Sequence, residues 1–99
     1  MKNSTTLIIS TLFIATFGFG QTTYVPDDNF EQALIDLGYD DVLDDYVLTA
    51  NISGVTYLNV SSKEISDLTG IQDFTALTSL QCGNNYLTSL DVSANTALT

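Results

Sequence analysis

The sequence predicts an α/β protein: a solenoid fragment built of short parallel strands, preceded by a short helical N-terminal cap. Two observations predict this fold. An apolar pattern recurs from residue 55 onward with a period of 22 and then 21 residues, which is typical of stacked repeat units. A segment with helical spacing and capping residues precedes it. The 99 residues bound the chain to one domain at most.

The composition excludes several classes of function. The chain has 12 Asp and Glu residues against 2 Lys and Arg, no His and a single Cys. Without histidine, this stretch offers neither Ser-His-Asp nor Cys-His catalysis, and a single cysteine builds no zinc cage. We therefore expect a non-catalytic module with no cofactor and no metal. The strong negative charge repels nucleic acid and anionic membranes, so neither is an expected partner.

Residues 1–20 have the features of a secretory signal peptide. Lys2 precedes an apolar run over residues 7–19, and Gly18-Phe19-Gly20 supplies small residues at alternate positions before the expected cleavage site. A transmembrane anchor is the alternative, but the run has about 13 residues, some of them polar, against the roughly 20 needed to span a bilayer. We expect cleavage after Gly20 and a secreted or cell-surface chain without membrane insertion.

Residues 21–54 are expected to form an acidic helical cap. Asp28 followed three positions later by Glu31 resembles a capping box, and Gly38 is a helix stop. The acidic residues at 27, 28 and 31 are interpreted as partners of the helix dipole. The apolar positions between these signals follow the spacing i, i+3, i+4, i+7, and they are Phe30, Ala33, Leu34 and Leu37.

The next segment, residues 39–48, again shows helical spacing and predicts a second short helix or helical turn. Asp40, Asp41, Asp44 and Asp45 fall on its opposite face, where a calcium site that stabilises the cap is one hypothesis. A twelve-residue calcium loop starting at Asp40 would end at Asn51 rather than Glu, and its sixth residue would be Asp rather than Gly. A solvated acidic face is therefore the preferred interpretation.

Residues 55–99 hold about two repeat units, 55–76 and 77–97, with Leu98-Thr99 opening a third. They match the template L-x-x-L-x-L-x-x-N-x-L, in which each unit lays its apolar ladder on the next. Asn85 takes the turn position of the second unit, where its amide can satisfy backbone groups, and Lys63 replaces it in the first. The aligned ladder positions are Val55 with Leu77, Leu58 with Leu80, Val60 with Cys82, Ile65 with Leu87 and Leu68 with Leu90.

Cys82 is the only cysteine, and two interpretations are open. A lone thiol in an exported protein can pair between molecules. It also lies at a ladder position, where cysteine behaves as a small buried hydrophobe. We expect it to be buried and inert.

The repeat template and the cap together resemble bacterial leucine-rich-repeat proteins. The stretch from PDDNFEQALIDLG through GVTYLNVSSKEISDLTGIQDFTALTSL is similar to the helical cap and first repeats of the internalins. The phrase LTSLDVS-NTALT is similar to secreted repeat proteins of Bacteroidetes. The resemblance implies a cap that seals one end of a curved solenoid, whose concave strand face binds other macromolecules.

The resemblance also assigns the concave face. Its outward strand positions fall on Tyr57, Asn59 and Ser61 in the first unit and on Ser79, Gln81 and Gly83 in the second. Tyr57 is the one aromatic residue among them, and a rigid amphipathic ring is a common binding hot spot. An ordinary solvent-facing tyrosine is the alternative interpretation.

Two functions from different classes fit these features. The first is a secreted or surface-displayed leucine-rich-repeat module that binds a protein or glycan through the concave face. The second is the N-terminal positioning region of a longer secreted enzyme. Repeat proteins need about three or more units and a cap at each end. We therefore expect the chain to be the start of a longer protein, or else to self-associate through its last repeat.

Overall fold

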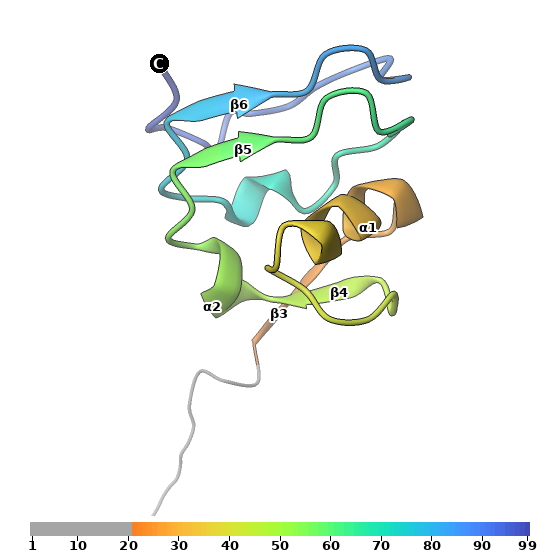
Figure 1. The fold of residues 1–99 in the computed structure, drawn as a ribbon. Helices are drawn as coiled ribbons and strands as arrows, with labels where there is room; N and C mark the ends of the chain where they lie inside the picture. Colours follow the sequence, from red (N-terminus) through yellow and green to blue (C-terminus); the bar gives the residue numbers. More distant parts are fainter. Residues whose placement is uncertain (1–20) are drawn as a thin grey trace, which may run out of the picture.

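The computed structural model describes residues 21–99 and shows a small α/β fold; the predicted signal peptide lies outside the described residues. None of the helices between residues 21 and 99 has the length and apolar character needed to cross a membrane. Figure 1 shows β3, β4, α1 and α2 at one end of this part of the molecule and the pair β5 and β6 at the other. The elements in chain order are β3 (Thr22–Tyr24), α1 (Asp28–Asp36), β4 (Tyr46–Leu48), α2 (Thr49–Ile52), β5 (Tyr57–Asn59), the 3₁₀ helix η2 (Ile71–Asp73) and β6 (Ser79–Gln81).

The cap contains an antiparallel two-stranded sheet, β3 paired with β4, which the sequence did not predict. Thr23 and Val47 are opposite each other and buried, while their neighbours along both strands point to solvent. The predicted second helix over 39–48 is therefore wrong. Residues 39–45 are irregular, and the segment after them is a strand because β3 supplies hydrogen-bonding partners for its backbone. The amide of Val25 extends this pairing with a 2.8 Å bond to the carbonyl of Asp45.

Helix α1 forms where the sequence predicts it, but its N-cap is Asp27 rather than Asp28. The Oδ1 atom of Asp27 accepts hydrogen bonds from the amides of Asn29 and Phe30, at 2.9 and 3.1 Å. Glu31 does not complete a capping box, since its carboxylate accepts hydrogen bonds from the loop before β4 instead. The helix ends before Gly38, whose φ of +89° is the left-handed conformation that glycine adopts at low cost.

The repeat register is confirmed by the parallel pairing of β5 with β6, which sets Leu58 opposite Leu80. The turn role of Asn85 is confirmed as well. Its Oδ1 atom accepts from the amides of Lys63 and Ile65 at 2.9 and 3.1 Å, and its Nδ2 atom donates to the carbonyls of Val60 and Cys82, both at 2.9 Å. One side chain thus satisfies backbone groups in both repeat units.

Threonines mark the same repeat at the amino ends of the strands. The Thr78 hydroxyl donates to the Thr56 carbonyl at 3.0 Å, and the Thr99 hydroxyl donates to the Thr78 carbonyl at 3.3 Å. The spacing between these residues, 22 and then 21, is the predicted period. Leu98-Thr99, the predicted start of a third unit, is therefore hydrogen-bonded to the second unit.

A single hydrophobic core joins the cap to the first repeat unit. The rings of Phe30 on α1 and Phe74 after η2 stack with their centroids 6.4 Å apart. The buried core residues are Val25, Phe30, Ala33, Leu34, Val47, Ile52, Val55, Leu58, Val60, Ile65, Leu68, Ile71, Phe74 and Leu77. This cluster includes every predicted ladder position of the first unit.

The ladder of the second unit is less buried than the sequence predicts. Leu80, Cys82 and Leu87 are half-buried against the core, and Leu90 is 47% exposed. Helical residue Leu37, predicted to face the core, is also 47% exposed because it falls at the C-cap of α1. Within residues 21–99, the second unit packs on the first, and Leu98 and Thr99 follow it, with the Thr99 amide bonded to the Thr78 carbonyl.

The cap and the first unit approach each other closely at Gly70. A Cβ atom added there would lie 2.8 Å from Cγ2 of Val25 and 2.9 Å from the carbonyl oxygen of Tyr24. The buried Thr23 hydroxyl bridges the same junction, with its oxygen 2.7 Å from the Thr49 hydroxyl and donating to Asp73 Oδ2 at 2.8 Å. Only glycine combines this close approach with a φ of +110°.

We therefore expect Gly70→Ala to lower the free energy of unfolding by about 2–4 kcal/mol, from backbone strain and from the clash with β3. Chemical denaturation followed by circular dichroism measures this change. Gly54→Ala is the matched control, since a Cβ there meets nothing within 4 Å, and it should change stability by less than about 0.5 kcal/mol. Equal effects of the two substitutions would contradict the proposed junction.

Candidate binding surface

The candidate binding surface is the solvent-facing side of the β5 and β6 pair, which we call the strand face. Its six residues are those that the sequence assigned to a concave face: Tyr57, Asn59, Ser61, Ser79, Gln81 and Gly83. The register pairs Tyr57 directly with Ser79 and Asn59 directly with Gln81. All four side chains are exposed, while Leu58 between them is buried. The two-residue alternation of a strand produces this separation.

Backbone hydrogen bonds continue the pairing past the carboxyl ends of β5 and β6. The amide of Val60 donates to the Gln81 carbonyl at 2.8 Å, and the amide of Ser62 donates to the Gly83 carbonyl at 2.9 Å. The Oδ1 atom of Asn59 accepts from the amide of Ser61 at 3.1 Å, which orients this side chain. Figure 1 shows β5 and β6 side by side, at the end of the fold away from the cap sheet. The exposed side chains therefore stand on a hydrogen-bonded frame.

The strand face is uncharged, although the chain is strongly acidic. Tyr57, which is 52% exposed, is its one large side chain. Around it lie hydroxyl and amide groups, which donate and accept hydrogen bonds. A surface of one aromatic ring and neutral polar groups suits a macromolecular ligand better than an ion or a reacting substrate.

A second cluster of polar side chains lies in the cap, around Glu31. This residue is completely buried. Its Oε1 and Oε2 atoms accept hydrogen bonds from the amides of Asp45 and Asp44, at 2.9 and 3.2 Å. Carboxylate oxygens of Glu31, Asp40 and Asp44 lie within 4.8 Å of one another, as do those of Asp28, Glu31 and Asp45. The four aspartates are thus not one solvated helix face, because the loop that carries them wraps around Glu31.

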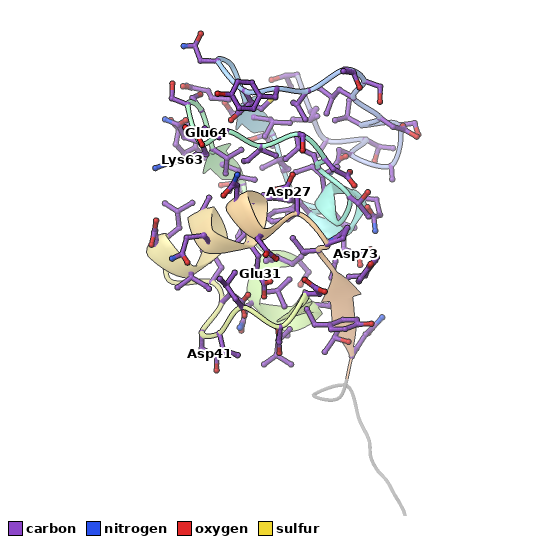
Figure 2. The ribbon with its side chains drawn as sticks, turned by 90° about the vertical axis from the view of Figure 1, so that its right-hand side faces the viewer. Asp27, Glu31, Asp41, Lys63, Glu64 and Asp73 are labelled. Carbon is purple, nitrogen blue, oxygen red and sulfur yellow. The ribbon has the colours of Figure 1, made fainter. Side chains whose placement is uncertain are left out.

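Burial raises the pKa of Glu31 to about 7, and the neighbouring Asp40 carboxyl adds to this rise. The amide bonds from Asp44 and Asp45 act in the opposite direction but do not cancel it. The Oδ2 atom of Asp40 is buried without a hydrogen-bond partner among the described residues, and the protonated Glu31 carboxyl is the donor available to it. Figure 2 shows Glu31 in the middle of the cap and Asp41 at its outer end.

Sequence reasoning missed Glu31 and also Asn95. Asn95 is buried, and its Nδ2 atom donates to the carbonyls of Ile71 and Phe74 at 2.8 and 3.0 Å. The sequence did contain a clue, since TALT occurs at 75–78 and again at 96–99 and so places Asn95 at a repeat position. The clue for Glu31 is its place one residue after Phe30 and three before Leu34, beside the apolar stripe of the helix.

Comparison with known proteins identifies the relatives of this fold. No protein-family model matches the chain. It is 35% identical over 85 residues to internalin J of Listeria monocytogenes serotype 4b (strain F2365), an alignment that covers 82% of this chain. The solved functional domain of that protein, InlJ, superposes with a TM-score of 0.67 at 35% identity over 85% of this chain. The chain is homologous to the internalins.

A second solved structure agrees on the fold. An internalin (inlF) from Listeria monocytogenes str. 4b F2365 superposes with a TM-score of 0.68 at 22% identity over 77% of this chain. The internalin resemblance predicted from the cap and repeats is thus confirmed. This internalin-like chain spans 9% of the length of internalin J and 19% and 23% of the two solved chains.

The buried Glu31 predicts a pH-dependent stability of the internalin-like cap. Because its pKa is raised in the fold, its contribution to stability is fully present below about pH 4.5 and is lost as the pH rises toward about 7. We expect the unfolding free energy of the unsubstituted protein to fall by about 1–3 kcal/mol over this pH range. The unfolding free energy of Glu31→Gln should not show this fall.

Denaturation at several pH values measures the difference between the two proteins. Asp36→Asn removes an exposed charge from the same helix and should retain the full pH dependence. A Glu31→Gln profile parallel to that of the unsubstituted protein would show that Glu31 does not hold its proton in the fold.

Proposed function

We propose that this protein is an exported, non-catalytic leucine-rich-repeat module that binds a protein partner through the strand face. The observation that carries the proposal is the uncharged, exposed row of side chains on a hydrogen-bonded pair of parallel strands, with Tyr57 as its only large anchor. Such an anchor contributes most when a neutral rim excludes water around it. Residues 1–20 would direct export, and the chain would act in the medium or at the cell surface.

Homology to the internalins supports a role in protein interaction. The chain spans 9% of the length of internalin J, and any further repeat unit would extend the same strand face. Each added unit would place three more outward side chains beside Ser79, Gln81 and Gly83. The six residues of the strand face would then form the end of a longer concave surface that lies nearest the cap.

The position of Cys82 fits the same relationship. The functional domain of InlJ includes a cysteine ladder. Here Cys82 occupies a ladder position of the second repeat unit and is half-buried against the core, with a free thiol. We infer that Cys82 marks the ladder position at which such a series would run, and that its role is packing between units.

The binding role of Tyr57 is tested in two steps. A photo-reactive benzoylphenylalanine at position 57 first identifies the protein partner by cross-linking, with the same group at the exposed Tyr86 as control. The affinity of the purified partner is then measured for Tyr57→Ala and Tyr86→Ala. We expect Tyr57→Ala to weaken binding at least about tenfold, as a hot-spot residue does, and Tyr86→Ala to leave it within about twofold.

Cross-linking from position 86 but not from position 57 would contradict the assignment of the strand face. So would an unchanged affinity of Tyr57→Ala for the identified partner.

A further inference from the structure

We propose that the exposed side of the cap sheet is a second docking surface, and that its partner is a basic polypeptide segment with interspersed apolar side chains. We call this surface the cap face; it consists of Thr22, Tyr24, Tyr46 and Leu48. It lies on β3 and β4, whereas the strand face lies on β5 and β6, so the two are independent (Figure 1). A failure of one proposal leaves the other standing.

The cap sheet places the four residues of the cap face on one side. Thr22 pairs with Leu48 and Tyr24 with Tyr46, on the side of the sheet opposite the buried pair Thr23 and Val47. The two tyrosine rings lie with their centroids 5.5 Å apart and tilted by 46°. Tyr24 is 51% and Tyr46 46% exposed, so both rings offer open surface. An aromatic pair in this position presents a wide apolar platform.

Exposed apolar side chains are concentrated in the cap. Within residues 21–99, six of the nine large hydrophobic side chains that are exposed lie between residues 24 and 48. They are Tyr24, Leu37, Val42, Leu43, Tyr46 and Leu48. Single exposed apolar residues are ordinary, but a concentration of them on one part of a surface marks an interaction site.

The cap is strongly acidic. Residues 21–54 carry 8 of the 12 acidic residues and neither lysine nor arginine. Asp40, Asp41 and Leu48 line one small hollow beside the sheet, and the labelled Asp41 lies at this outer end of the cap in Figure 2. Asp44 lies next to the tyrosine pair, since its Oδ1 atom accepts from the amide of Tyr46 at 3.0 Å. Carboxylates therefore lie beside both ends of β4, the strand that carries Tyr46 and Leu48.

These features together select the partner. A lysine or arginine side chain gains both from a carboxylate and from an aromatic face, while its aliphatic stem covers apolar surface. A second copy of this chain would bring an equally acidic cap and be repelled. The same charge opposes an anionic membrane surface. A basic segment with apolar side chains can pair with the carboxylates and also pack on the tyrosine rings.

The test measures binding of a synthetic twelve-residue peptide that alternates Lys or Arg with Leu and Ser, by fluorescence anisotropy at low and physiological salt. Tyr46→Thr keeps a good strand former and should weaken binding at least about tenfold. Tyr86→Thr makes the same change at an exposed tyrosine in the second repeat unit and should leave binding within about twofold.

A second comparison, of Asp41→Asn with Asp91→Asn, uses substitutions that change no residue of the cap sheet. Both substitutions remove one exposed charge, so a non-specific attraction of the peptide to an acidic protein would change equally in both. We expect Asp41→Asn to weaken binding at least about threefold at low salt and Asp91→Asn to have less than half that effect. Melting temperatures of all four variants report whether each is folded.

Equal binding by the two aspartate variants overturns the proposal, whatever the tyrosine variants show. So does equally tight binding of a peptide in which Glu or Gln replaces every Lys and Arg. Competition by a neutral oligosaccharide would assign the platform to a glycan instead. A dimer in sedimentation that Tyr46→Thr dissociates would assign it to a second copy.

Discussion

The rest of the structure depends on the hydrogen bonds that the Asp27 carboxylate accepts. One of its oxygens caps α1 through the amides of Asn29 and Phe30, and the other accepts from the amides of Ser66 and Asp67, at 2.9 and 3.0 Å, and from the Ser66 hydroxyl at 3.1 Å. Burial would raise the pKa of Asp27, but the hydrogen bonds from Ser66, Phe30 and Asp67 outweigh it and lower the pKa. The group that starts the helix therefore also holds the first repeat unit.

This arrangement compensates for an irregularity in the first unit, which has Lys63 where the repeat template has asparagine. The backbone amides of its turn find acceptors on both sides. Asn85 of the next unit accepts from the amides of Lys63 and Ile65, and Asp27 of the cap accepts from the amides of Ser66 and Asp67. Asn29 adds a bond from its Nδ2 atom to the Glu64 carbonyl at 2.9 Å. The turn of the first unit is thus held from both sides, by side chains of the cap and by Asn85 of the second unit.

The features that could be predicted from the sequence are those that repeat or that lie within one turn of helix. The spacing of Leu58 and Leu80 determined the strand register, and the turn role of Asn85 followed from the same template. The β3 and β4 pairing escaped prediction because each strand has three residues and the partners are far apart in sequence. Glu31 escaped because its burial depends on a loop that wraps back over the helix. The exposure of Leu90 depends on what packs beyond it, which the ladder pattern alone does not contain.

The measurement that tests the role of Asp27 most directly compares Asp27→Asn with Asp28→Asn by amide hydrogen exchange and denaturation. Asparagine still caps a helix through its one oxygen, but its amide nitrogen cannot accept from Ser66 and Asp67. We expect Asp27→Asn to cost about 1–3 kcal/mol and to speed exchange at those two amides, because they lose hydrogen bonds to a charged acceptor. Asp28→Asn, which removes an exposed charge from the same helix turn, should change stability by less than about 0.5 kcal/mol. Unchanged exchange at Ser66 and Asp67 in Asp27→Asn would contradict the account.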